Sequence, residues 1–240
     1  AIQQYVDLFG GNPALIAFAG PGYGFDDPNL GVILVNETQI YGFIVMGLMS
    51  IFLTNRHTRA EEESERAELV RSGAVGRHAP GVAAALAVAG ANVVIGVVTA
   101  ASFVALGYGV EGSLALAASY TVVGLLFAGL TAVAAQVFTS GRTVLAVASV
   151  ALGVAFMVRA VGDIADSWVR WLSPMGWAQG VRAFAGERWW LLVLCVAVAG
   201  SAYLASFWLE SRRDLGGGLV GQRPGPASVT GWRATPWGLV

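Results

Sequence analysis

Long apolar stretches alternate with short polar segments along this chain of 240 residues. A helix needs about 20 apolar residues to cross the hydrocarbon core of a bilayer. Stretches of roughly that length lie at residues 32–54, 80–108, 114–138, 143–161 and 189–209. The pattern therefore predicts an all-α fold, a polytopic bundle of five transmembrane helices.

The first and fourth stretches are weaker than the other three. Polar Asn36, Glu37 and Gln39 interrupt the start of the first. The fourth is short, and Arg142 and Arg159 flank its apolar centre. Long arginine side chains near helix ends can extend to the membrane interface, so we expect both arginines to do so.

Small residues recur every four positions on the last two stretches, which is typical of faces where transmembrane helices approach closely. These faces comprise Ala197, Ser201 and Ala205 on the fifth stretch, and Ser149, Gly153 and Met157 on the fourth.

A charge-dense polar segment, residues 55–79, separates the first two stretches. From Arg59 to Ser72 it contains strong helix formers and neither proline nor glycine. Glu62 precedes Arg66 by four residues, an arrangement that stabilises a helix. The apolar face is too small to bind lipid, so we expect this helix to dock on a protein partner. The alternative is a solvated loop that only joins two spans.

Composition supports a membrane protein. The chain is 56% hydrophobic and 12% charged, whereas soluble domains carry about 25% charged residues. A net charge of −1 argues against binding of nucleic acid. All 14 basic residues are arginine, and the absence of lysine excludes a GxxxxGK[ST] phosphate loop. We therefore expect no ATPase activity, no catalytic residue and no metal cluster in this chain.

The distribution of arginine predicts the orientation. If segment 55–79 is cytoplasmic, ten arginines lie on the cytoplasmic side and four on the outer side, in line with the positive-inside rule. The amino end is then outside and the carboxyl end inside. Residues 1–31 form an outer segment, residues 162–188 an outer cap, and the Gly/Pro-rich residues 211–240 a cytoplasmic linker.

Ionisable residues are scarce inside the predicted spans. An ion-driven carrier usually binds its coupling ion at such groups. The polar exceptions are Asn92, Gln136 and, near the outer end, Glu37. We interpret each of them as making a helix-to-helix hydrogen bond or as lying at a membrane interface. The pattern favours a protein whose driving energy comes from elsewhere. His57 and His78, at the membrane junctions of segment 55–79, are interpreted as interfacial residues.

Four local patterns resemble the membrane subunits of bacterial type-2 ABC exporters, specifically the polyketide-antibiotic (tetronasin-type) exporter permeases. They are NPALIAFAGPGYG at 12–24, RHTRAEEESERAELVRSGAVGRHAP at 56–80, WLSPMGWAQGVRAFAGERWW at 171–190 and RRDLGGGL at 212–219. Together they follow the whole chain in order.

The resemblance implies that the five spans are spans two to six of a six-span first half, so that the permease is incomplete. The missing spans or a second half would complete it in the plasma membrane. Segment 55–79 would contain the coupling helix that docks on a separate ATPase subunit, where ATP and Mg²⁺ bind. Carried onto this chain, that role falls on Glu61, Glu62, Glu63, Arg66, Glu68 and Arg71.

The resemblance also implies export of amphipathic or lipophilic compounds such as antibiotics. The outer cap is predicted to form an outer gate of Trp171, Pro174, Trp177 and Arg182, or else only to shield the helix ends. Two other functions stay open. One is a secondary carrier or channel subunit that uses Glu37 or Asp163, and the other is a non-transporting membrane protein whose polar segment docks a cytosolic partner.

Overall fold

The computed structural model describes residues 2–63, 76, 78–212 and 218, and this part of the chain is helical with no β-strand. The elements are α1 (Ile2–Gly10), α2 (Pro13–Ala19), α3 (Leu30–His57), α4 (Arg59–Glu63), α6 (Ala79–Ala105), α7 (Val110–Val137), α8 (Gly141–Ile164), η1 (Trp168–Leu172), α9 (Pro174–Gln179) and α10 (Trp190–Glu210). The predicted all-α class is confirmed.

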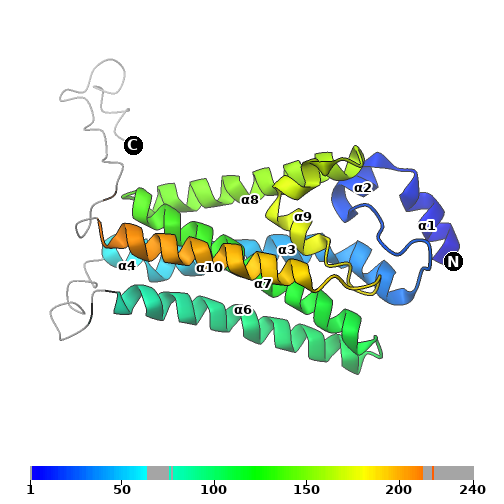
Figure 1. Ribbon diagram of the computed structural model, residues 1–240, viewed down its shortest axis with the longest axis horizontal. Helices are drawn as coiled ribbons and strands as arrows, with labels where there is room; N and C mark the ends of the chain where they lie inside the picture. The colour runs from blue at the N-terminus through cyan, green and yellow to red at the C-terminus, as the bar shows by residue number, and fades with distance from the viewer. Residues whose placement is uncertain (1, 64–75, 77, 213–217, 219–240) are drawn as a thin grey trace, which may run out of the picture.

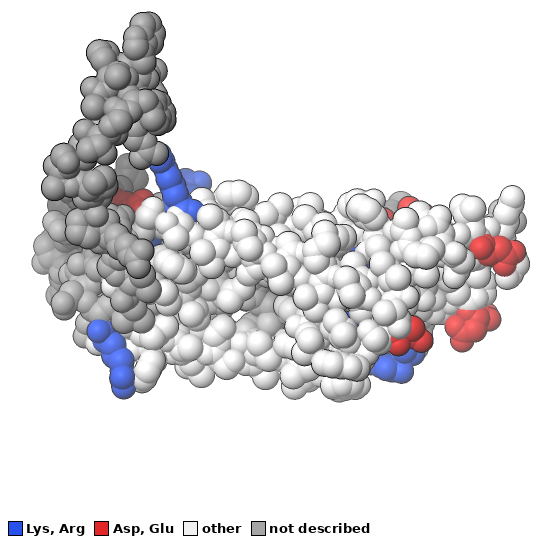
Figure 2. Space-filling view, turned by 90° about the horizontal axis from the view of Figure 1, so that it is seen from above, with Lys and Arg blue, Asp and Glu red and all other residues white. Residues whose placement is uncertain are grey.

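Five helices, α3, α6, α7, α8 and α10, are long and apolar enough to cross a membrane. They run side by side along the long axis of the molecule (Figure 1). In the space-filling view the middle of the visible face is uncharged, and the coloured charged groups gather at the two ends (Figure 2). Figure 1 also shows the two ends of the bundle: the α4 end, and the opposite end with α1, α2 and α9, called the α9 end. The short helix η1 packs against α8 and α9.

The helices differ from the predicted spans by a few residues at their ends, for local reasons. Helix α3 begins at Leu30 because the Asn29 side chain accepts a hydrogen bond from Val32 N at 3.0 Å. Helix α6 ends at Ala105 because the chain turns at Gly107, whose φ of +91° favours glycine.

Helix α7 is the centre of the bundle and packs against α3, α6, α8 and α10. Most of its side chains are buried, whereas α6 and α10 each bury one stripe. The buried stripe of α6 consists of Ala84, Val88, Asn92, Gly96 and Ala100. Because these residues are spaced by four, they lie on one face of a helix. Helix α6 therefore packs on its neighbours along a single edge.

The two predicted small-residue faces are not the packed faces within this chain. Ala197, Ser201 and Ala205 are exposed, and a Cβ at Gly153 would meet nothing within 4 Å. Helix α10 instead packs through its neighbouring stripe, which includes Cys195 and Ala199. Alanine is common along the whole chain, so spacing alone selected the wrong stripe.

Asn92 joins three helices in the interior of the bundle. Its amide donates to Ser50 Oγ of α3 at 2.9 Å, and its own backbone oxygen accepts from Thr121 Oγ1 of α7 at 3.3 Å. Gln136 of α7 donates to Ser206 Oγ of α10 at 3.4 Å. The predicted helix-to-helix hydrogen bonds of Asn92 and Gln136 are therefore confirmed.

Candidate functional site

The short helix α4 is fastened to the turn between α7 and α8. Arg59, only 1% exposed, donates from Nε to the carbonyl of Phe138 at 2.8 Å and pairs with Glu62. Glu63 accepts a hydrogen bond from Gly141 N at 2.7 Å. This carboxylate lies at the start of α8, where the free amide groups of the first turn favour a negative charge. Helix α4 is thus held by two separate contacts.

The carboxylates of α4 differ in environment. Glu61 and Glu63 are exposed and Glu62 is half-buried. The Glu61 side chain is 53% accessible, and its Oε1 lies 3.6 Å from His57 Nδ1. Glu62 and Glu63 engage Arg59 and Gly141 as described above. Arg66, Glu68 and Arg71, the remaining predicted coupling residues, lie outside the described residues, as does most of the predicted linker 211–240. Nothing local in the sequence singled out Arg59.

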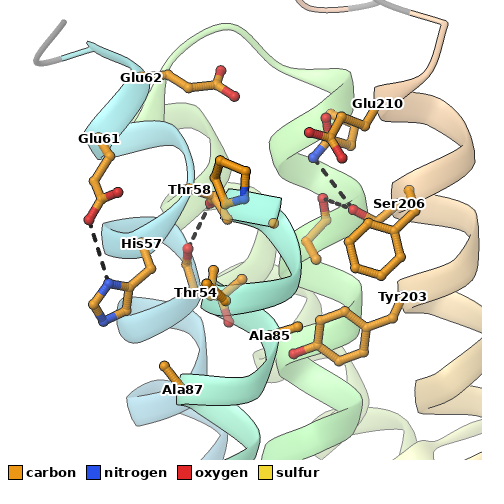
Figure 3. A pocket seen from close by; sticks show the side chains of 17 residues that line it. Thr54, His57, Thr58, Glu61, Glu62, Ala85, Ala87, Tyr203, Ser206 and Glu210 are labelled. Atoms are coloured by element: carbon orange, nitrogen blue, oxygen red, sulfur yellow. Dashed lines mark hydrogen bonds and ion pairs between the residues drawn. The ribbon is translucent and has the colours of Figure 1, made fainter. Parts of the chain in front are cut away.

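A cavity of about 390 Å³ opens at the α4 end between α3, α6, α7 and α10, with α4 at its rim (Figure 3). Local sequence does not reveal this cavity, because the cavity depends on which helices become neighbours. Its lining consists of Thr54, His57, Thr58, Glu61, Glu62, Pro80, Gly81, Ala83, Ala84, Ala85, Ala87, Ala132, Gln136, Tyr203, Ser206, Phe207 and Glu210.

The rim of the cavity is acidic. Glu61 and Glu62 come from α4, and Glu210 comes from the last turn of α10 (Figure 3). Glu210 Oε2 lies 2.8 Å from His78 Nδ1 at the start of α6. Both junction histidines therefore lie beside rim carboxylates, His78 within hydrogen-bond distance of Glu210 and His57 within ion-pair distance of Glu61.

Two buried hydroxyl groups, Thr54 Oγ1 of α3 and Tyr203 Oη of α10, lie in the cavity wall. Thr54 is 3% exposed. Tyr203 extends from α10 across the cavity toward α3 (Figure 3). Buried hydroxyls are normally hydrogen-bonded, and the Tyr203 hydroxyl interacts with the Thr54 side chain, so the two groups form one polar position in the cavity wall.

The α9 end contains a buried ion-pair network that corrects the prediction for Arg159. Arg159 is fully buried and does not extend to an interface. It donates to Asp163 Oδ2 at 3.1 Å and to the carbonyl of Ala17 at 2.6 Å, and Arg170 lies 3.7 Å from Asp163. Helix α2 covers this end of α8 and supplies the carbonyl, a long-range contact that local sequence does not reveal.

The predicted gate residues lie in two parts of the α9 end. Trp177 donates from its indole nitrogen to the carbonyl of Trp171 at 2.6 Å, and Pro174 begins α9 between them. Arg182 instead lies over the ring of Tyr23, between α2 and α3, 4.4 Å from the ring centroid. The cap is anchored by Ser173, whose hydroxyl donates to Ala155 O of α8 at 2.7 Å.

The two carboxylates that a carrier would use both have partners at the α9 end. Asp163 pairs with Arg159, and Glu37 accepts a hydrogen bond from Tyr5 Oη at 2.6 Å. Burial and this bond to Glu37 raise the pKa of Tyr5 to about 12. Tyr5 therefore stays protonated and fastens α1 to α3.

The five apolar helices make this chain a multi-pass membrane protein. Residues 2–209 match the family described as the C-terminal domain of the multidrug efflux system permease Rv1217c. The chain belongs to that family. The multidrug efflux system permease protein Rv1217c of Mycobacterium tuberculosis (strain ATCC 25618 / H37Rv) is 37% identical over 228 residues, which are 95% of this chain.

The chain spans 41% of the length of that relative. The matching family is a C-terminal domain, a description that gives no support to the assignment of the chain to a first half. The ABC permease kind fits these relatives, and the narrower tetronasin-type resemblance stays a prediction.

Proposed function

We propose that this chain is part of the membrane permease of an ATP-driven exporter that moves amphipathic or lipophilic compounds, including antibiotics, out of the cell. ATP and Mg²⁺ would bind a separate ATPase subunit, and α4 would begin the helix on which that subunit docks. The observation that carries the proposal is the double attachment of α4 to the α7–α8 turn through Arg59 and Glu63. The multidrug efflux relative supports the export of drugs.

The attachments of α4 suggest how the force of ATP binding reaches the bundle. Helix α4 follows α3 after a single residue, Thr58, and contacts the ends of α7 and α8 through side chains. A displacement of α4 would therefore move α3, α7 and α8 together. Helix α6 would respond through its edge contact around Asn92. Tilting of these helices would change access to the space between permease halves.

We place the α4 end in the cytoplasm of the bacterial cell and the α9 end outside. The arginine distribution supports this orientation, with ten arginines in the segments assigned to the α4 side and four in those assigned to the other. The cap formed by η1 and α9 would then serve as an outer gate, with Trp171 and Trp177 at its bonded turn. We also retain the tetronasin-type resemblance as the proposed subfamily.

Co-purification with ATPase subunits tests the coupling role. The full-length protein is purified in lipid nanodiscs with each candidate ATPase encoded beside it. An acidic docking helix would bind a basic surface of the ATPase, so Glu61→Arg would place like charges opposite each other. Because like charges across an interface cost several kcal/mol, we expect this variant to reduce ATPase binding about tenfold or more. Glu61 suits the test better than Glu62 or Glu63, since those two hold α4 to the rest of the chain through Arg59 and Gly141.

Asp27→Arg is the matched control, because Asp27 is exposed at the opposite end of the bundle. It should leave ATPase binding unchanged. Equal ATPase retention by Glu61→Arg and Asp27→Arg would rule out α4 as the docking element. Failure of every ATPase to bind the unmodified protein would contradict the exporter proposal itself.

A further inference from the structure

We propose that a cleft at the α9 end binds the carboxylate group of an amphipathic compound, which Arg182 and Gln39 hold by charge and hydrogen bonds. The inference rests on the proposed export function and adds to it a class of cargo and the place that binds it. It uses three features of the described residues: two buried donors without a partner, a guanidinium that joins no ion pair, and a cleft floor with room for one oxygen atom.

The cleft lies where the first turns of α3 meet α2 and the segment after α9 (Figure 1). Its volume is about 10 Å³, which is about the space that one water molecule needs. Val32, Gln39 and Ala183 are buried and form its floor, whereas Tyr23 and Arg182 are half-buried and form its mouth. One oxygen of a ligand group can therefore enter while the body of the ligand stays at the mouth.

Two donor groups that line the cleft have no hydrogen-bond partner among the described residues. They are Gln39 Nε2 and Arg182 Nε, and both atoms are buried. Gln39 as a whole is 3% exposed. Gln179, another buried amide of the lining, instead donates to the carbonyl of Ala19 at 3.4 Å. Buried polar groups are normally hydrogen-bonded, and a guanidinium nitrogen can only donate, so the group that completes this site is an acceptor.

The charge of Arg182 favours an anionic acceptor. Arg59, Arg159 and Arg170 form the arginine ion pairs of the described chain, and Arg182 joins none of them. Its guanidinium lies over the ring of Tyr23, and the described lining of the cleft contains no carboxylate. A charge held away from water is stabilised by an opposite charge, and a planar carboxylate matches a planar guanidinium in shape.

The backbone and Tyr23 hold Arg182 in place. Its φ is +57°, in the left-handed region that is uncommon for residues other than glycine. Such a conformation persists only where the surrounding structure imposes it, and it occurs often at ligand sites. The Tyr23 ring beneath the guanidinium is itself fixed, because its hydroxyl interacts with Arg170. Arg182 is therefore positioned at the cleft before a ligand binds.

Naphthoate and its amide, naphthamide, test the inference, because they share a shape and only naphthoate is charged at neutral pH. Binding to the full-length protein without ATPase is measured by equilibrium dialysis in maltoside micelles, and empty micelles correct for partition. We expect saturable binding of naphthoate and binding of naphthamide that is weaker by about tenfold or more, the effect of one charged hydrogen bond. Equal binding of both probes would overturn the proposal. Saturable binding of neither would overturn it too and would leave the cleft to an ordered water.

Competition with lipid separates a cargo carboxylate from a lipid phosphate, the other amphipathic anion of a membrane. Short-chain phosphatidylglycerol is added to the micelles at the naphthoate concentration that half-saturates the protein. We expect naphthoate binding to stay unchanged, because a tetrahedral phosphate is bulkier than a planar carboxylate and the cleft admits one oxygen. Displacement of naphthoate by the lipid would assign the cleft to a headgroup and overturn the proposed class of ligand.

Gln39→Leu locates the site. Leucine is close to glutamine in size and lacks the unpartnered amide, so the variant should fold at least as well as the unmodified protein. We expect it to bind naphthoate about fivefold more weakly, the effect of one hydrogen bond. Thr38→Val is the matched control at the adjoining position, because Thr38 does not line the cleft and bonds to Leu34 O. Equal affinity of the two variants would exclude this cleft.

Arg182→Gln tests the charge of the site. It should weaken naphthoate binding by about tenfold or more and should remove the preference for naphthoate over naphthamide. Arg188→Gln removes the same charge from the same cap, outside the cleft, and should leave binding unchanged. Equal losses in the two variants would contradict a specific site. Thermal unfolding verifies that both variants fold.

ATPase co-purification separates this proposal from the proposed function. Naphthoate binding that fails while the ATPase still binds refutes the cleft alone. Naphthoate binding without any ATPase partner leaves the cleft intact and removes the ATP-driven mechanism.

Discussion

Two arginines, Arg59 and Arg159, are the largest fully buried side chains of the described chain, and they stand at opposite ends of the bundle. Each binds a carboxylate on its own or the adjoining turn and a backbone carbonyl far away in sequence, Phe138 O and Ala17 O respectively. A buried charge is tolerated only when it is paired and hydrogen-bonded. These residues therefore fix where the end segments attach.

The sequence did not predict these roles. Arginine at a span boundary most often extends to the membrane interface, which was the prediction for Arg159, and it is wrong because α2 folds over that position. Local sequence did not reveal the hydrogen bond from Gly141 N to Glu63 either, since it depends on the α7–α8 turn lying beside α4. Contacts that join distant segments leave no pattern in local spacing.

Breaking the buried pair at the α9 end should destabilise the protein strongly. We expect Arg159→Met to lower the free energy of unfolding by about 3 kcal/mol or more, because Asp163 keeps a buried charge with only Arg170 nearby. The measurement is denaturant unfolding in bicelles. Adding Asp163→Leu to Arg159→Met should restore part of the loss.

The exposed carboxylate Asp166 provides the control, since 91% of its side chain is accessible although it also pairs with Arg170. Asp166→Asn should change the free energy of unfolding by less than about 1 kcal/mol, as for other surface ion pairs. A loss for Arg159→Met no larger than that for Asp166→Asn would show that the buried network contributes little to stability.

At the scale of helices, hydrophobic runs predicted all five spans to within a few residues, because the length of an apolar run reports directly on membrane thickness. The packed faces were harder to predict. In a membrane bundle, the side chains that face lipid and those that pack between helices are both apolar. The sequence pattern therefore does not distinguish the packed stripe of α10 around Cys195 and Ala199 from the exposed stripe around Ser201. Polar residues were better guides, as Asn92 and Gln136 show.

The close contact between α6 and α7 at Asn92 can be tested by replacing glycines with alanine. A Cβ at Gly124 of α7 would lie 1.7 Å from Asn92 Oδ1. We expect Gly124→Ala to separate α6 from α7 and to lower the free energy of unfolding by about 1–3 kcal/mol, the usual effect of overpacking.

Gly90 of α6 is the control position, because an added Cβ there meets nothing within 4 Å. Gly90→Ala should raise stability slightly, by up to about 1 kcal/mol, through helix propensity. Denaturant unfolding measures the change in the free energy of unfolding for both variants. Equal changes would contradict the close contact at Asn92.

At the scale of the whole molecule, charged groups on the visible face lie at its two ends (Figure 2). The two ends differ in structure. The α9 end is closed by α1, α2 and the cap, which are bonded to α3 and α8 through Glu37, Arg159 and Ser173. The α4 end has an open cavity with an acidic rim. This asymmetry is compatible with a protein that works in one direction across the membrane.

The orientation can be measured because Cys195 is the single cysteine and is fully buried. In a Cys195→Ala background, Asp27→Cys and Glu61→Cys each introduce one exposed thiol at opposite ends. A membrane-impermeant maleimide added to intact cells should label Asp27→Cys, and should label Glu61→Cys only after lysis. The reverse pattern would invert the proposed topology.

Glu61 and Glu62 belong both to the rim of the cavity and to α4. If a compound in this cavity and the ATPase each act on these residues, the two binding equilibria are linked, and the linkage is reciprocal. A compound that strengthens ATPase attachment by some factor must itself bind the assembled complex more tightly by that factor. At a given concentration of ATPase, the fraction of permease that has the ATPase attached would then change with the concentration of the compound, without a separate sensor.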